Sequence, residues 1–164
     1  MAEVRTVPPW LRVAFHLPDR LYRHGLGVLL GRRFLRLVHV GRRSGTRYAT
    51  VLEIVRYDPR GPELVVVSGF GWDADWLRNI RANGMAEVTV GRRTFTADHR
   101  LLSPEEAAAV LGAYEHRNPA IRPVVRRVLS WLLGWRYDGS PDARRQAVAQ
   151  LPLVALRPTG DGAA

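Results

Sequence analysis

A loop rich in arginine and glycine, Gly41-Arg42-Arg43-Ser44-Gly45-Thr46-Arg47, is the segment of this sequence best suited to hold an anion. Its glycines permit unusual backbone angles, and its hydroxyl and guanidinium groups supply donors with no acidic residue beside them. Such a set can bind a phosphate, because backbone N–H groups reach it closely and guanidinium groups donate to it in pairs. The loop does not match a Walker-type phosphate loop, which needs a lysine and a following helix. A basic turn that faces only solvent stays open as the alternative.

A second segment, Ser68 to Asn79, leaves a strand-like run through a glycine-rich bend and enters a helix. The free N–H groups at a helix start favour an anion or the polar edge of a ring. Trp72 and Trp76, four positions apart, could form a wall for a flat aromatic ligand. For either tryptophan alone, packing as a core anchor is the favoured interpretation.

Other site chemistries have little support in the sequence. Cysteine is absent, which excludes disulfides, thiol nucleophiles and zinc sites with sulfur ligands. The five histidines lack a metal-ligand spacing: His16, His24, His39, His99 and His116. Neighbouring carboxylates, such as Asp73 with Asp75 or Glu105 with Glu106, are typical of helix starts rather than of acid–base pairs. We therefore expect no metal site and nominate no catalytic residue.

Length and charge narrow the class of protein. The 164 residues, 46% hydrophobic and 24% charged, suit one globular domain. The net charge is +10, and every basic residue that contributes to it is an arginine. This charge would attract nucleic acid, acidic lipid or a phosphorylated small molecule. No nucleic-acid-binding module is recognisable, and neither a signal peptide nor an apolar run of about 20 residues is present. We expect a cytoplasmic protein that does not bind nucleic acid.

The order of elements predicts a small β-barrel with added helices, an α+β fold. Strands are expected at Phe34–Val40, Thr50–Tyr57, Glu63–Val67, Glu87–Val90, Thr94–Leu101 and Leu153–Leu156. Helices are expected at Ala74–Ala82 with Asp73 as its cap, from the Ser103 capping box, at Ile121–Leu133 and from Ser140. Two amphipathic helices are expected within residues 1–33, a barrel domain over 34–158 and a flexible tail over 159–164.

Several motifs in this order resemble the deazaflavin-dependent nitroreductase family. They are the Gly41–Gly45 loop, Thr50-Val51-Leu52, Ser68 to Trp76, Arg78 to Asn83, Glu87–Val90, the Ser103 capping box, Arg136–Gly139 and Leu151–Leu156. Members of that family are split β-barrels related to FMN-binding pyridoxamine-phosphate oxidases, and many use coenzyme F-420, an 8-hydroxy-5-deazaflavin. The resemblance therefore implies a split barrel with a helical insertion before its last strand.

The resemblance also implies cofactor-binding residues, which fall into three groups along the chain. The acidic tail of the coenzyme would be held by Arg42, Arg43 and Ser44, with Arg47 in place of a family arginine near Tyr48. The ring system would lie along Thr50 and Val51. The ring and its linker would meet Ser68, Gly69, Trp72, Trp76 and Asn79. Val51 stands where the best-studied branch has proline, Gly69 lies near that branch's lysine, and a basic segment from Ile121 to Tyr137 replaces its tyrosine-bearing helix.

The function implied is an oxidoreductase that passes hydride from reduced coenzyme F-420 to an electron-poor acceptor. The acceptor is a quinone, an activated alkene or a nitroaromatic compound, and the coenzyme rather than a protein nucleophile supplies the hydride. Two alternatives stay open: an FMN-dependent enzyme of the same superfamily, and a non-catalytic carrier of a flavin or lipid. The basic and apolar stretch from Trp10 to Gly31 suggests peripheral contact with the inner face of the membrane, with a cap on the barrel as the alternative. Both a monomer and a homodimer fit the sequence.

Overall fold

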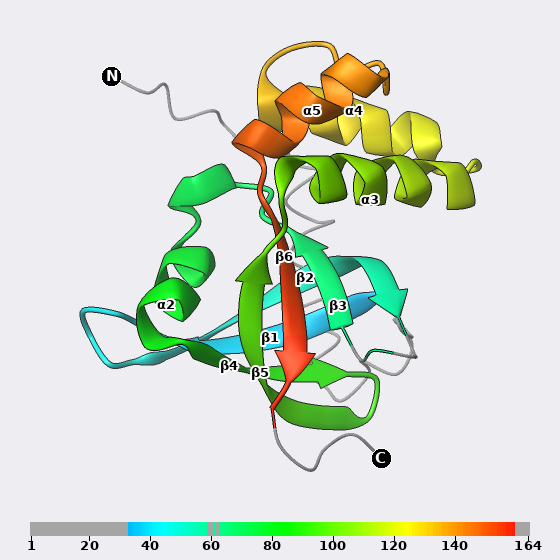
Figure 1. Cartoon of the computed structure of the whole chain (residues 1–164). Coiled ribbons are helices and arrows are strands. Elements are labelled where there is room, and N and C mark those ends of the chain that lie inside the picture. The colour runs from blue at the N-terminus through cyan, green and yellow to red at the C-terminus, as the bar shows by residue number, and fades with distance from the viewer. Residues whose placement is uncertain (1–32, 59–60, 62, 160–164) are drawn as a thin grey trace.

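The barrel is built from six antiparallel strands joined edge to edge in the order β1-β2-β3-β6-β5-β4 (Figure 1). A computed structural model describes residues 33–58, 61 and 63–159. The strands are β1 (Phe34–Val40), β2 (Arg47–Asp58), β3 (Glu63–Val67), β4 (Met85–Val90), β5 (Arg93–Leu101) and β6 (Leu153–Pro158). This arrangement confirms the small barrel and its six strands, with β2 longer at its start than the sequence predicts.

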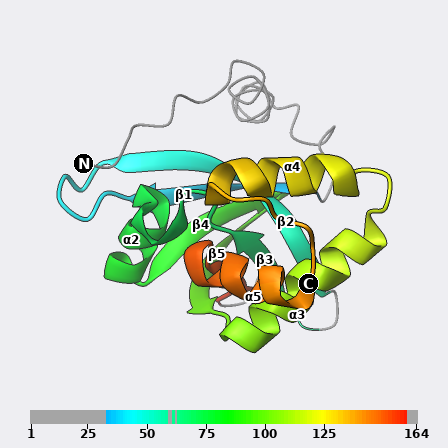
Figure 2. The ribbon, with the colours of Figure 1, turned by 90° about the horizontal axis from the view of Figure 1, so that it is seen from above.

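Within the described residues, four α-helices cover the barrel. They are α2 (Asp75–Asn83), α3 (Pro104–Arg117), α4 (Arg122–Leu133) and α5 (Pro141–Gln150). The last three form a layer over one end of the barrel, whereas α2 lies separately at its side (Figures 1 and 2). Ser103 and Ser140 cap α3 and α5, since each side chain accepts a backbone N–H bond of 3.2 Å from the residue three positions on. Both predicted serine caps are confirmed.

The predicted cap of α2 is wrong. Asp73 belongs to a short 3-10 turn, η2 (Gly71–Asp73), and its carboxylate pairs with Arg78 at 3.1 Å instead of accepting a helix N–H. Ala74 occupies the N-cap position and makes no side-chain cap bond. The 3-10 turn takes up the residues that the sequence pattern assigns to the helix start, so α2 begins at Asp75.

Two apolar cores meet across the strands. Alternate residues of β3 show this division, because Leu64 and Val66 point into the barrel while Val65 faces the helical layer. Helix α2 packs its apolar face, including Leu77 and Ile80, against the barrel core. Near the helical layer, one face of a barrel strand therefore packs in the core inside the barrel, and the other face packs in the core under the helices.

The helical layer is held together by one buried carboxylate. Glu115 of α3 is 1% exposed and accepts hydrogen bonds from Arg126 Nε of α4 at 2.9 Å, Arg144 Nε of α5 at 3.1 Å and the Tyr137 hydroxyl at 2.9 Å. Burial alone would raise the pKa of Glu115, but these donors outweigh burial and lower it. The ionised side chain thus joins three helices at one point.

The barrel is split along part of β2. This strand pairs with β1 from Arg47 to Glu53, but with β3 only from Ile54 to Asp58. In the described chain, the first half of β2 therefore has a strand neighbour on one side alone. Thr50 and Val51 of that half share cavities with Phe70 and Gly69 of the bend where the chain leaves β3.

The predicted N-terminal helices lie outside the described residues, as does the tail beyond Thr159. Their role at a membrane or as a cap on the barrel stays a prediction. Within the described part of the chain, none of the helices is both long enough and apolar enough to span a membrane.

Candidate functional site

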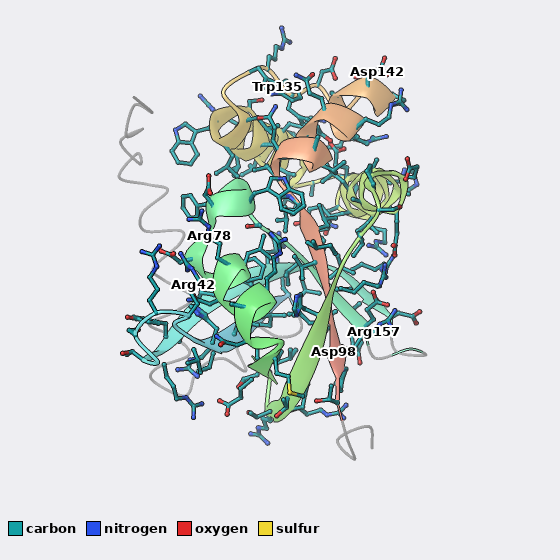
Figure 3. The ribbon with its side chains drawn as sticks, turned by 60° about the vertical axis from the view of Figure 1, so that its left-hand side comes forward. Arg42, Arg78, Asp98, Trp135, Asp142 and Arg157 are labelled. Carbon is teal, nitrogen blue, oxygen red and sulfur yellow. The ribbon has the colours of Figure 1, made fainter. Side chains whose placement is uncertain are left out.

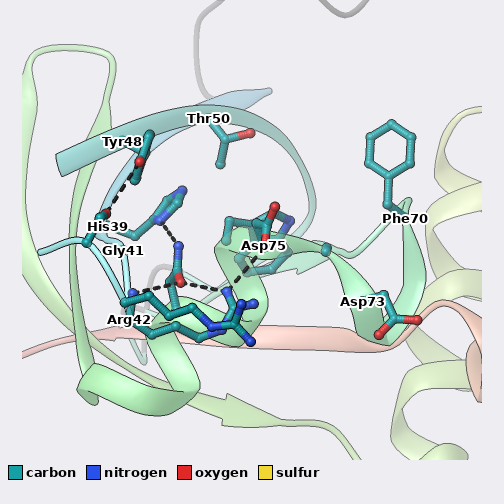
Figure 4. A pocket seen from close by; sticks show the side chains of 13 residues that line it. His39, Gly41, Arg42, Tyr48, Thr50, Phe70, Asp73 and Asp75 are labelled. Carbon is teal, nitrogen blue, oxygen red and sulfur yellow. Dashed lines mark hydrogen bonds and ion pairs between the residues drawn. The ribbon is translucent and has the colours of Figure 1, made fainter. Parts of the chain in front are cut away.

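A cavity of about 750 Å³ opens between the loop after β1, the start of β2 and the start of α2 (Figure 4). Six of the eleven predicted site residues line it: Arg42, Arg43, Ser44, Thr50, Trp76 and Asn79. Figure 4 shows Arg42, His39 and Tyr48 at one end of this cavity and Phe70 with Asp73 at the other. The arginine-rich loop and the segment entering α2, far apart in sequence, thus face one space.

The loop after β1 is fixed by its own backbone. The Gly41 N–H donates to the Thr46 carbonyl at 2.8 Å, and the Gly45 N–H donates to the Gly41 carbonyl at 2.9 Å. A Cβ on Gly41 would lie 2.6 Å from Ser44 Oγ and 2.9 Å from the Tyr48 ring, so a larger residue there would have to displace these side chains. The φ of +67° at Gly45 also favours glycine. The loop is therefore held in one shape, with its polar groups arranged on the cavity wall.

Asn79 connects three elements at the base of the cavity. Its Oδ1 accepts from the Arg42 backbone N–H at 3.1 Å and from Arg42 Nη1 at 2.9 Å. Because Oδ1 takes both of these donors, Nδ2 is the group that donates to His39 Nδ1 at 3.0 Å. Asn79 is 4% exposed, its bond to His39 is buried and its bonds to Arg42 are part-buried, and together they fix α2 to β1 and to the loop.

His39 is neutral in this arrangement. Burial lowers its pKa by more than the nearby carboxylate of Asp75 raises it. With Nδ1 occupied as an acceptor, the ring proton is on Nε2, which leaves one N–H donor on a side chain that lines the cavity. The Tyr48 ring stacks beside His39 with centroids 5.9 Å apart.

The two arginines of the loop differ in their availability to a ligand. Arg42 is already held, because its Nη1 lies 3.2 Å from Asp75 as well as bonding to Asn79. Arg43 is exposed and has no hydrogen-bond or ion-pair partner within the described residues. An anion entering the cavity would therefore meet one positioned guanidinium group and one unpaired guanidinium group.

Three predicted site residues lie away from this cavity. The Arg47 side chain pairs with Glu87 at 3.2 Å. Ser68 is fully buried, and its hydroxyl donates to the Gly71 carbonyl at 2.7 Å, which closes the bend before α2. The Trp72 indole donates to the Ala149 carbonyl at 2.9 Å. Trp72 and Trp76 therefore do not form one wall, because the Trp72 indole bonds to α5 whereas Trp76 lines the cavity from α2.

The other two, Val51 and Gly69, line a second and mainly apolar cavity of about 300 Å³. It lies beneath α4, between that helix and the outer face of β2. Its apolar walls include Leu111, Val124, Val125, Val128 and Leu132. At its polar end the Tyr114 hydroxyl donates to Glu53, which also pairs with Arg33 at 3.1 Å.

Several residues of the first cavity are absent from the sequence-based site: His39, Gly41, Tyr48, Phe70, Asp73, Ala74 and Asp75. The register of β1 with β2 places His39 opposite Tyr48, and sequence reasoning does not supply that register. Phe70, 62% exposed beside the bend, has a visible sequence signal because it lies inside the glycine-rich segment, and Gly41, Asp73, Ala74 and Asp75 also fall within the two segments singled out in the sequence. Figure 3 shows Arg42 and Arg78 on the same side of the molecule, below the helical layer that carries Trp135 and Asp142.

Solved structures share this fold at low sequence identity. An F420-H2 dependent reductase aligns with a TM-score of 0.51 and 17% identity over 77% of this chain and 96% of its own. A domain-swapped dimer gives 0.51 and 17% over 90% and 97%. The heme storage protein HutZ from Vibrio cholerae gives 0.52 and 15% over 86% and 92%. These likenesses confirm the split-barrel fold, whereas no curated protein sequence matches the chain.

The family itself is identified from sequence. A family model described as "F420H(2)-dependent quinone reductase" matches residues 16–123, which is more than half of the chain. The matched part includes the arginine-rich loop, β2, the bend after β3 and α2, which together supply the lining of the first cavity. The chain therefore belongs to this family and is an oxidoreductase that depends on the reduced deazaflavin coenzyme F-420.

Proposed function

We propose that the protein binds reduced coenzyme F-420 in the 750 Å³ cavity and reduces a quinone that enters from the apolar cavity beneath α4. The observation that carries this proposal is that the two cavities border the same split in the barrel. Thr50 and Phe70 line the first cavity, whereas their neighbours in the chain, Val51 and Gly69, line the second. A donor in one cavity and an acceptor in the other would approach each other at this edge.

The residues present fit the coenzyme. Its tail is acidic, and the loop offers the unpaired Arg43, the Ser44 hydroxyl and the N–H groups of a fixed backbone. Its ring is flat and largely apolar, and Phe70 and Trp76 supply aromatic surface farther along the same cavity. The cavity therefore has an anionic-ligand end and an aromatic end in the order that the coenzyme needs.

The chemistry resides in the coenzyme, and the chain positions it. When bound, the reduced coenzyme would supply a hydride and one proton, which together convert a quinone to the quinol. Asn79 holds Arg42 and His39 in place, so their donors are set before a ligand arrives. The neutral His39 ring offers its Nε2–H to an electron-rich oxygen or nitrogen of the ligand.

A quinone with an aliphatic chain suits the second cavity better than a small nitroaromatic compound or alkene. Its walls are side chains of valine and leucine, and burial of each methylene group contributes about 0.8 kcal/mol. Tyr114, Glu53 and Arg33 confine polar groups to one end, where a quinone oxygen could be met.

Gly69 provides the test. A Cβ there would meet only Leu132, at 3.7 Å, so Gly69→Ala is accommodated, whereas Gly69→Leu fills the cavity. We expect Gly69→Leu to raise KM at least tenfold for a quinone with a long aliphatic chain, and Gly69→Ala to change it little. A quinone without the chain should be affected much less, and the Kd for the coenzyme should be unchanged. A weaker coenzyme Kd with unaltered quinone KM would place Gly69 in the coenzyme site and contradict this route.

Coenzyme choice can be tested separately. The unpaired cation and the rigid loop favour a ligand with several negative charges over the single phosphate of FMN. We expect tighter binding of the deazaflavin than of FMN in a fluorescence titration, with affinity falling as salt rises. Equal affinities would favour the FMN-dependent alternative, and tight binding without quinone reduction would favour a carrier.

A further inference from the structure

A second concentration of arginine lies on the helical layer, away from the coenzyme cavity. A surface hollow of about 480 Å³ lies between α4 and the loop that follows it, and four arginines line it: Arg122, Arg126, Arg127 and Arg136. The loop folds back along the helix because the Tyr137 backbone N–H donates to Ser130 Oγ at 2.9 Å. This bond brings Arg136 to the same hollow as the arginines of the helix.

Most of this positive charge is uncompensated. Arg126 is engaged by Glu115 at 2.9 Å, but Arg122, Arg127 and Arg136 have no ion-pair partner in the part of the chain that the structure describes. One acidic residue, Asp138, lines the hollow. The Ser140 backbone N–H bonds to its carboxylate at 2.8 Å and lowers its pKa, so it is ionised. Three unpaired guanidinium groups thus face one carboxylate.

The same helix presents apolar surface next to this charge. Val124 lies in the first turn of α4 and is 59% exposed, and with Val125 and Val128 it lines the apolar cavity beneath the helix. Arginines on the polar side of an amphipathic helix, with an exposed apolar side chain on another side, are typical of a helix that lies at a membrane surface. The unpaired arginines are all exposed, so they do not enclose a small ligand as a dedicated phosphate site would.

We propose that this surface, the α4 basic face (Arg122, Val124, Arg127 and Arg136), binds the phosphate headgroups of an anionic membrane. The arginines would pair with headgroup phosphates, while Val124 would contact the acyl boundary. The contact depends on neither the coenzyme nor the acceptor. It would also bring the apolar cavity, which shares Val124, towards the lipid phase in which long-chain quinones dissolve.

The test is co-sedimentation of the full chain with phosphatidylcholine vesicles, with and without phosphatidylglycerol. The variant is Arg122→Ala/Arg127→Ala, which leaves the Arg126–Glu115 bond intact. The matched control is Arg92→Ala/Arg93→Ala in the β4–β5 turn, which removes equal charge at the end of the barrel away from the helical layer (Figure 1). We expect about fivefold weaker binding for each α4 arginine removed, hence about 25-fold for the pair, and a much smaller effect in the control.

A third variant separates a membrane surface from a phosphate site. Arg122→Lys/Arg127→Lys keeps the charge, so it should retain most of the vesicle binding, and binding should weaken with salt. Equal losses in the α4 pair and the control pair would overturn the proposal in favour of a general field. Unchanged binding in the α4 pair would overturn it too. The proposal would also be overturned if Arg122→Lys/Arg127→Lys bound vesicles as weakly as Arg122→Ala/Arg127→Ala does and soluble glycerol phosphate competed with the vesicles. Thermal unfolding of each variant verifies that the fold is intact. The vesicle assay contains neither coenzyme nor quinone, so its result does not depend on whether the proposed function is correct.

Discussion

Replacement of Arg43 by alanine should weaken coenzyme binding without weakening the fold. The Arg43 side chain is exposed and makes no hydrogen bond or ion pair with other described residues, so its removal breaks no internal interaction. Any cost must therefore appear in the complex. A hydrogen bond to a charged group contributes about 1.5–3 kcal/mol, which corresponds to roughly a tenfold to hundredfold rise in Kd.

Arg42 makes an informative comparison because the structure gives it different surroundings. Its guanidinium group already pairs with Asp75 and Asn79, so an anion would share a cation that has partners. Arg42→Ala should therefore raise the coenzyme Kd and also lower the free energy of unfolding, since the bonds to α2 are lost. Arg43→Ala should change Kd alone.

The assay is fluorescence titration of reduced or oxidised coenzyme, paired with urea unfolding of each variant. Arg92→Ala, in the β4–β5 turn, is the control for net charge, because it removes one exposed arginine outside the cavity. If Arg43→Ala and Arg92→Ala raise Kd equally, the loop contributes only to a general positive field. The reasoning about a specific tail site would then be refuted.

Three further variants test the fold around the site. Asn79→Leu removes the partner of a part-buried backbone N–H and of a buried imidazole, and should lower the free energy of unfolding by about 1–3 kcal/mol in urea; an unchanged midpoint would show that water replaces those bonds. The hydrogen bond from Arg100 lowers the pKa of Glu106 from 4.5 to about 2, so the stability that this carboxylate contributes is present above pH 4.5 and is lost as the pH falls to 2. Glu106→Gln should flatten that part of the pH dependence of unfolding, and an identical slope in both proteins would contradict the assignment. Gly139→Ala places a Cβ against the Arg126 guanidinium at a φ of +78° and should lower stability by about 1–3 kcal/mol in thermal unfolding, whereas an unshifted Tm would mean that the loop relaxes.

Local signals in the sequence predict most elements of this fold. Serine followed by proline marks the starts of α3 and α5, because the side-chain cap and the fixed φ of proline act within a few residues. The predicted start of α2 is wrong, because an acidic residue before a helix can either cap that helix or pair with another side chain. Asp73 pairs with Arg78 in the next turn of the chain. Local chemistry permits both outcomes, and packing of the bend selects one.

Some residues of the candidate site can be predicted from a short segment of sequence, whereas others depend on contacts between distant parts of the chain. The loop residues Arg42, Arg43 and Ser44 are identifiable because one short segment concentrates glycine and donors. The division of Thr50 and Val51 between two cavities depends on where β2 loses its pairing with β3, which is a property of the closed sheet. His39 could not be nominated for a related reason, since its bond to Asn79 joins residues 40 positions apart.

The bonds that join Glu115 of α3 to α4, to α5 and to the loop between them have a consequence for how the protein opens. Lifting α4 or α5 alone would leave an ionised carboxylate buried with too few donors, which is costly, so the helices above the barrel should separate from it as one cooperative unit. Slowly exchanging amide protons in α3, α4 and α5 should then share a common opening free energy. Access to the space beneath α4 would come through rotation of side chains at its mouth, with the backbone of the layer staying in place.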